Sequence, residues 1–187
     1  MRDKMYPIFK RLDLLEWRAC NRIARLGAYK PLLWLLRKCS WLGDYPAWIA
    51  LCVALPVIHG MRWWALAVSW GLCAAFGGLL YRFLKNLLAR ERPYISFNMI
   101  PCSMPPLDRY SFPSGHTLHA IMFTTLTHYY APHLLIAVIP FAILVITSRV
   151  VLGLHYLTDV LAGGLIGYAI ARLGIYAIDT AFVGWFN

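Results

Sequence analysis

Long apolar segments separated by short polar connections dominate the chain from residue 46 onward. A membrane-spanning helix needs about 20 predominantly apolar residues. Four segments approach this length, at residues 63–84, 116–131, 133–153 and 155–178, and a fifth at 46–58 reaches it only if its helix begins near Trp41. The pattern predicts an all-α fold, a polytopic membrane helix bundle with five transmembrane helices and room for a sixth.

The first 45 residues have a different pattern. Within residues 1–30, apolar side chains are interspersed with basic ones: Leu12, Leu15, Trp17 and Ile23 stand among Lys10, Arg11, Arg18, Arg22 and Arg25. Such a helix lies in the membrane interface. Between residues 29 and 43 a full crossing is disfavoured by central charges, namely Lys30, Arg37 and Lys38. We therefore predict a basic amphipathic interfacial segment at 1–45 and a membrane-embedded domain at 46–187.

Composition adds information on partners. Hydrophobic residues make up 60% of the chain, the formal net charge is +10, and ten of the 18 Lys and Arg residues lie before Tyr45. These charges favour contact with anionic membrane lipids. Nucleic acid binding is not expected, because there is no separate soluble basic domain. No cleavable signal peptide is expected either, because charged residues stand where its apolar region would be.

The cysteines and histidines predict no metal site and no cofactor. The five cysteines are scattered without a C-x-x-C pair. A bridge between Cys39 and Cys102 stays open, because sequence does not give its geometry. His116 and His119 have helical spacing, but no carboxylate or thiolate accompanies them, so metal binding is disfavoured.

Three short polar motifs stand at the ends of apolar segments. They are Lys85, six residues, Arg92 and Pro93; then Pro113-Ser114-Gly115-His116; then Ser148-Arg149, five residues, His155, three residues and Asp159. Successive spanning helices alternate in direction. The segment at 63–84 therefore ends where the segment at 116–131 begins, and the segment at 133–153 ends where the last begins. All three motifs are predicted to share one membrane face.

Local signals refine this picture. The helix that begins at Trp63 is expected to continue to about Glu91 and to be ended by Pro93. Lys85 and Arg92 would then share one stripe, about 10 Å apart along the axis. Small residues four apart on the last segment predict a close packing face, formed by Gly163, Gly167 and Ala171.

Together the motifs can form a phosphate cage with a nucleophile and an acid. Arginine and lysine bind phosphate oxygens, and Ser114 and Gly115 are expected to open a helix whose N-terminus favours an anion. His155 and Asp159 are four apart on a helix, so the carboxylate can hold one ring nitrogen and leave the other as nucleophile. His116 is then free to protonate the leaving oxygen.

These spacings resemble, without a departure, the motifs of the type-2 phosphatidic acid phosphatase superfamily, which includes glucose-6-phosphatase and vanadium haloperoxidases. The resemblance covers about residues 63–178 and implies a metal-independent phosphatase. It implies that His155 forms a phosphohistidine, that His116 is the general acid and that Asp159 orients the nucleophile. The implied phosphate binders are Lys85, Arg92, Ser114, Gly115 and Arg149. The first 60 residues carry no motif and stay outside it.

The substrate is less determined. A site on a bundle with almost no soluble domain favours a phosphate or diphosphate on a lipid. The short chain resembles compact bacterial members that act on undecaprenyl diphosphate, which is our first choice; phosphatidic acid, phosphatidylglycerophosphate and lipid A 1-phosphate are alternatives. A haloperoxidase is disfavoured because those relatives are soluble. A non-catalytic lipid-binding or transport protein would tolerate loss of His155, whereas both histidines and Asp159 are intact.

Two indications of orientation disagree. The resemblance implies a bacterial inner membrane with the site facing the periplasm or exterior. Lys and Arg are more numerous on the motif side, which the positive-inside rule assigns to the cytoplasm. We prefer the resemblance, because several of these charges are predicted phosphate ligands. No oligomeric state is predicted.

Other polar residues are expected to be structural. Headgroup contacts are expected of Arg82, Arg90 and Arg109, and packing or interfacial positions of His59, His119, His128 and His133. The loop at 94–113, with its single acid Asp108, is either a rim or lid of the site or a cover for helix ends.

Overall fold

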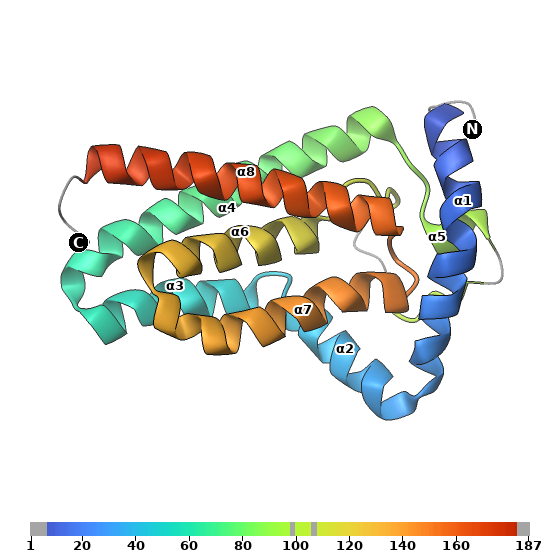
Figure 1. Ribbon diagram of the computed structural model, residues 1–187, viewed down its shortest axis with the longest axis horizontal. Helices are drawn as coiled ribbons and strands as arrows, with labels where there is room; N and C mark the ends of the chain where they lie inside the picture. Colours follow the sequence, from blue (N-terminus) through green and yellow to red (C-terminus); the bar gives the residue numbers. More distant parts are fainter. Residues whose placement is uncertain (1–6, 98–99, 106–107, 183–187) are drawn as a thin grey trace.

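The computed structural model describes residues 7–97, 100–105 and 108–182. Within these ranges the chain is helical and forms no strand, as Figure 1 shows. The helices are α1 (Pro7–Ala24), α2 (Lys30–Leu42), α3 (Pro46–His59), α4 (Trp64–Leu88), α5 (Pro93–Ser96), α6 (Gly115–Tyr130), α7 (Leu135–Val151) and α8 (Leu157–Ala181). The predicted fold class, an all-α membrane helix bundle, is confirmed.

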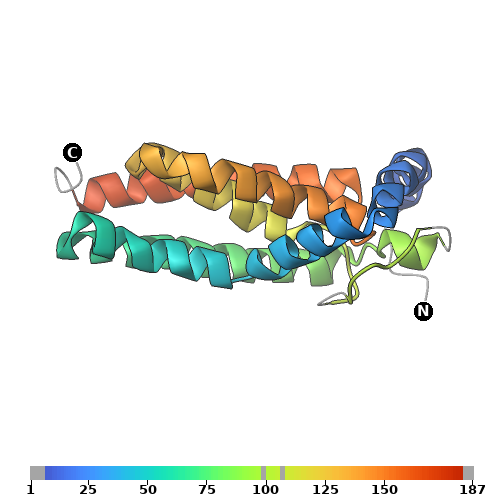
Figure 2. The ribbon, with the colours of Figure 1, turned by 90° about the horizontal axis from the view of Figure 1, so that it is seen from below.

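The long helices form two layers. Helices α3 and α4 lie in one layer and α6, α7 and α8 in the other (Figure 2). The core between them is apolar and aromatic; Trp48 stacks on Phe123 with ring centroids 4.9 Å apart. Helix α1 runs across the end of the bundle rather than along it (Figure 1), which is the orientation expected of an interfacial helix.

Three described segments are long and apolar enough to cross a membrane, namely Met61–Leu88, Pro132–Val151 and Leu157–Ala181. They correspond to predicted segments. The predicted segment at 46–58 is α3, which meets α2 at a bend of 58°, and this pair qualifies together as one broken span. The predicted segment at 116–131 is α6, whose 16 residues extend over only about 24 Å of the roughly 30 Å hydrocarbon core.

Helices α6 and α8 touch backbone to backbone. A Cβ atom on Gly163 would lie 2.4 Å from the carbonyl oxygen of Ser114, and one on Gly167 would lie 2.2 Å from that of Leu118. Ala171, further along the same face, is fully buried. The predicted small-residue face is confirmed, and it brings the start of α8 against the start of α6.

The end of α4 differs from the prediction. The helix stops earlier than expected, at Leu88, and Ala89 has a left-handed backbone with φ of 48°. Arg92 is extended because it precedes a proline, and Pro93 opens α5 rather than closing α4. The prediction that Lys85 and Arg92 share one helical stripe is therefore wrong, although both side chains still reach the same site.

The five cysteines are free thiols. The bridge considered between Cys39 and Cys102 is not formed: Cys39 is buried in α2, whereas Cys102 is exposed in the segment between α5 and α6. Cys102 is thus an accessible thiol near the motifs.

Candidate active site

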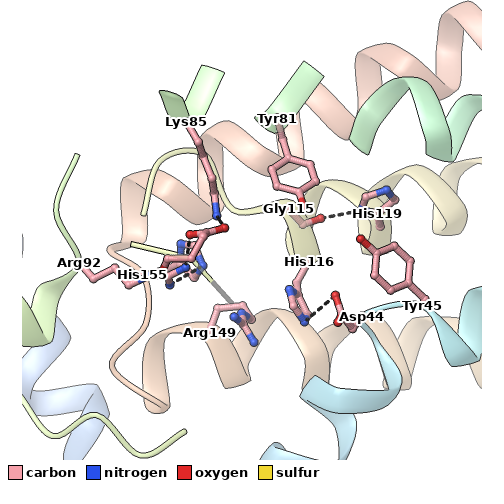
Figure 3. A pocket seen from close by; sticks show the side chains of 11 residues that line it. Asp44, Tyr45, Tyr81, Lys85, Arg92, Gly115, His116, His119, Arg149 and His155 are labelled. Carbon is pink, nitrogen blue, oxygen red and sulfur yellow. Dashed lines mark hydrogen bonds and ion pairs between the residues drawn. The ribbon is translucent and has the colours of Figure 1, made fainter. Parts of the chain in front are cut away.

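Residues of all three motifs line one cavity (Figure 3), as the alternation of helices predicts. The lining motif residues are Lys85, Arg92, Gly115, His116, Arg149 and His155. The other lining residues are Asp44, Tyr45, Tyr81, Asp108 and His119. Ser114 and Asp159, the two remaining predicted site residues, are fully buried beside the cavity.

Three buried cations surround the cavity. The relative exposure of Lys85 is 6%, that of Arg92 is 2% and that of Arg149 is 4%. Arg149 donates from Nη1 to the hydroxyl of Ser40, and its Nε is buried with no hydrogen-bond partner among the described residues. Buried cations are costly unless they are paired, so this arrangement indicates an anionic ligand.

In this structure, the carboxylate of Asp108 lies among these cations. Asp108 places Oδ2 2.6 Å from Lys85 Nζ and Oδ1 2.7 Å from Arg92 Nη2. The remaining cavity is about 20 Å³, room for about one water molecule. The two oxygens stand in for the phosphate oxygens that the same cations would bind. This contact favours the interpretation of the loop at 94–113 as a rim of the site.

His155 lies against the cations with one nitrogen and against a carboxylate with the other. Its Nε2 is 3.3 Å from Arg92 Nη1, and its Nδ1 is 3.5 Å from Asp159 Oδ2. Burial, and then the charges of Arg92, Arg149 and Lys85, hold the pKa of His155 well below its ordinary value. The ring is therefore neutral at neutral pH, and because Arg92 donates, Nε2 carries the lone pair.

His116, in the first turn of α6, lies on the opposite side of the cavity. Its Nε2 is 3.1 Å from the carbonyl oxygen of Ser40, which can only accept, so this nitrogen carries a hydrogen. Asp44 Oδ1 is 4.0 Å from the same nitrogen (Figure 3). A histidine between a carboxylate and a cavity is placed to carry a proton to or from a ligand.

Ser114 has a structural position in this structure. It is the N-cap of α6, where its hydroxyl accepts from the Thr117 backbone N–H at 3.5 Å. Its own backbone N–H donates to the carbonyl oxygen of Asp159 at 3.0 Å, which links the starts of α6 and α8. The predicted contact of the Ser114 hydroxyl with phosphate therefore stays a prediction, whereas Gly115 does line the cavity.

The sequence did not predict the contribution of the first 45 residues. Ser40 and Asp44, at the end of α2 and just beyond it, contact Arg149 and His116. The signal available was an acid between two apolar stretches, in a chain with only eight Asp and Glu residues. The domain division at residue 45 stays a prediction, but the site draws on both sides of it.

Arg90 corrects another expectation. Rather than contacting headgroups, it has a relative exposure of 0% and binds Asp159 and Asp13. Arg109 is exposed and lies 3.4 Å from Glu91. His119 packs between the carbonyl oxygens of Gly115 and Ala74 while it lines the cavity.

The sequence matches the PAP2 superfamily over residues 62–182. A decaprenylphosphoryl-5-phosphoribose phosphatase of Mycolicibacterium smegmatis is 37% identical over 134 residues, which cover 68% of each chain. A lipid A 1-phosphatase of Rhizobium etli is 33% identical over 133 residues, covering 66% of this chain and 50% of that relative. The chain thus spans about half the length of this second relative.

Two solved structures share the fold. A transmembrane PAP2 type phosphatidylglycerolphosphate phosphatase from Bacillus subtilis superposes with a TM-score of 0.68 at 22% identity, over 92% of this chain and 94% of that one. Aquifex aeolicus LpxE does so with a TM-score of 0.72 at 24% identity, over 94% and 99%. The resemblance inferred from the motifs is confirmed: the chain belongs to the PAP2 superfamily of phosphatases.

Proposed function

We propose that this membrane protein removes the terminal phosphate of a lipid phosphate or diphosphate through a phosphohistidine on His155. The observation that carries the proposal is the set of three buried cations beside a neutral, buried imidazole. Lys85, Arg92 and Arg149 offer several N–H groups to one phosphoryl group. Fixed cations in a poorly hydrated site stabilise the charge of a phosphoryl-transfer transition state.

An apolar groove supports a lipid substrate. The groove is about 550 Å³, lies between α3 and α4, and shares Asp44, Tyr45 and His119 with the cavity. Ile49 and Leu79 on its walls are 61% and 68% exposed, as expected of side chains that face hydrocarbon. A lipid can therefore lie with its chain along the groove and its phosphate among the cations, once Asp108 has moved aside.

The reaction has two steps. Nε2 of His155 attacks phosphorus and the bond from phosphorus to the lipid or pyrophosphate oxygen breaks. His116, which takes up a second proton when the anionic substrate binds, gives that proton to the departing oxygen and returns to its neutral form. A water molecule then gives a proton to His116 and attacks the phosphohistidine, which releases phosphate and restores His155. Asp159 holds the imidazole in the orientation and tautomer that leave Nε2 unprotonated.

Undecaprenyl diphosphate is the first substrate to test. The Mycolicibacterium relative is named for a polyprenyl phosphate compound, and the Rhizobium relative for lipid A 1-phosphate. The panel therefore includes undecaprenyl diphosphate, lipid A 1-phosphate, phosphatidylglycerophosphate and phosphatidic acid. Phosphate release from none of the panel would contradict the proposed lipid substrate. Activity should survive EDTA, because the cations of the cage are protein side chains.

The test of the chemistry is acid-quenched labelling with a radiolabelled substrate. His155→Ala should lose both turnover and the labelled phosphoenzyme. His116→Ala should turn over a lipid monoester, with its basic leaving oxygen, far more slowly than a diphosphate or nitrophenyl ester. Label that persists in His155→Ala, or equal fractional losses for both leaving groups in His116→Ala, would overturn these roles.

We also propose that the protein lies in a bacterial inner membrane with the site facing the periplasm or exterior. Cys102 provides the test, because it is the exposed cysteine and lies near the motifs. A membrane-impermeant maleimide should label it in intact cells, with Cys102→Ser as control. Labelling only after the membrane is opened would reverse the orientation.

A further inference from the structure

Arg90 lies on the far side of Asp159 from the catalytic histidine. It follows α4, and its side chain points between α1 and the start of α8, where it has no exposed surface. Nη1 donates to Asp159 Oδ1 at 2.6 Å, and Nη2 donates to Asp13 Oδ1 at 2.7 Å. One guanidinium therefore joins a carboxylate of α1 to the carboxylate beside His155.

The plane of this guanidinium is fixed by aromatic rings. Arg90 Cζ lies 4.1 Å from the centroid of the Tyr156 ring and 5.1 Å from that of Phe9. Guanidinium groups stack favourably on aromatic faces. Burial by itself lowers the pKa of Arg90, but Asp159, Asp13 and Glu16 outweigh it and raise the pKa, so the group stays charged.

Helix α1 also holds the start of α8. Glu16 accepts from the backbone N–H of Thr158 at 2.9 Å and from its hydroxyl at 2.6 Å. The backbone N–H groups in the first turn of a helix have no partner within the helix, so a carboxylate there stabilises it. Glu16 also lies 3.3 Å from Arg90. The two acids of α1, Asp13 and Glu16, therefore both stabilise the first turn of α8, which carries Asp159.

Both carboxylate oxygens of Asp159 have identified partners. Oδ1 accepts from Arg90, while Oδ2 accepts from the Tyr156 backbone N–H at 2.9 Å and faces His155 Nδ1 at 3.5 Å. Rotation of the carboxylate would break the contact with Arg90. The position of Oδ2, and with it the orientation of the imidazole, therefore depends on a cation that does not touch the phosphate cavity.

We propose that Arg90, held by Asp13 and Glu16 of α1, is a positioning residue for the reaction: it fixes the Asp159 carboxylate and through it the ring of His155. The inference rests on the proposed function, since it takes His155 as nucleophile. It gives α1 a part in catalysis, although α1 lies outside residues 62–182 that match the family.

A double-mutant cycle tests this directly. If Arg90 acts through Asp159, Arg90→Lys should lower kcat about tenfold and Asp159→Asn about 100-fold, while the double variant should resemble Asp159→Asn alone. The inhibition constant of vanadate should change less than about threefold in all three, because the cage is intact. Arg109→Lys is the matched control at an exposed arginine and should leave kcat unchanged.

The outcomes separate the alternatives. If the double variant is about 1,000-fold slower than wild type, the two single effects multiply and are independent. Arg90 would then stabilise the fold without acting through Asp159, and the proposal would be overturned. Unchanged kcat in Arg90→Lys would also overturn it. Asp13→Asn gives a second variant should Arg90→Lys not fold, and it should lower kcat at constant vanadate affinity. Full activity in His155→Ala would instead overturn the proposed function itself.

Discussion

The two sides of His155 have opposite charge. On the cavity side, the three cations Lys85, Arg92 and Arg149 outnumber the two carboxylates that line the cavity, Asp44 and Asp108, and only Asp108 forms ion pairs with them, to Lys85 and Arg92. On the other side a single cation, Arg90, contacts three carboxylates, those of Asp13, Glu16 and Asp159. The cavity side therefore needs an anion, and the other side is already satisfied by its own groups.

This difference separates the polar residues that can bind an anionic ligand from those that hold other side chains in position. The carboxylate cluster has two of its three acids almost completely buried, with Asp13 at 3% and Asp159 at 0% exposure. The acid that pairs with the cations of the cavity, Asp108, lies instead on a loop, and 39% of its side chain is exposed. A ligand can replace a half-exposed loop carboxylate far more easily than a buried one, so exchange is expected on the cavity side only.

The largest expected effect is on the cage. Arg92→Gln removes a bidentate donor that faces the developing charge, and it should lower kcat/KM about 1,000-fold. It should also weaken vanadate inhibition strongly, since vanadate imitates the five-coordinate transition state. Arg109→Gln is the control. Steady-state kinetics with a vanadate titration would measure both, and unchanged vanadate inhibition would remove Arg92 from the cage.

The next largest effect is on the carboxylate cluster. Asp159→Asn keeps the shape of the side chain but loses the charge that we propose to orient His155, so kcat should fall about 100-fold. KM and the inhibition constant of vanadate should stay within about threefold. A parallel loss of vanadate affinity would mean that the two sides of His155 are not separable.

A smaller effect of opposite sign is expected at Asp108. Asp108→Asn removes the carboxylate that pairs with Lys85 and Arg92, and that we expect to compete with phosphate for them. Inorganic phosphate should then inhibit about tenfold more strongly, which corresponds to about 1.4 kcal/mol. The measurement is product inhibition at fixed substrate. Weaker inhibition in this variant would show that Asp108 helps to bind the ligand rather than to exclude it.

The smallest effect concerns pH and stability. The folded protein holds the pKa of His155 well below about 6.5, the value in an unfolded chain. The contribution of a neutral His155 to stability is then fully present above pH about 6.5 and is lost as the pH falls below it, because only the unfolded chain takes up the proton. From pH about 7.5 to 5.5, wild type should lose about 3 °C more in Tm than His155→Gln. Equal losses in detergent melts would contradict the shift.

Much of the cavity followed from the sequence, because spacing and helix alternation are local properties. They predicted that Lys85, Gly115, His116, Arg149 and His155, from separate segments of the chain, meet at one end of the bundle, and all five line the cavity, although His155 lies just before α8 rather than on it. Arg92 also lines the site, but from an extended segment between α4 and α5 rather than from the predicted continuation of α4. The restriction that Pro93 places on its backbone outweighed helix continuation.

The supports of the site could not be predicted in the same way. Arg90 pairs with Asp13 across 77 residues and with Asp159 across 69. Which acid meets which cation depends on how α1 crosses the end of the bundle, and no periodicity in the chain encodes that crossing. The contacts of Asp108 could not be predicted either, because this residue lies on a loop whose sequence has no regular repeat.

The contact between α6 and α8 sets a limit on sequence variation. Gly163 and Gly167 lie against the carbonyl oxygens of Ser114 and Leu118 so closely that even alanine would push the helices apart. The Ser114 N–H would then leave the carbonyl oxygen of Asp159. Two positions that never touch a substrate are thus expected to tolerate as few replacements as His155 itself, and a library screened for activity should return glycine at both.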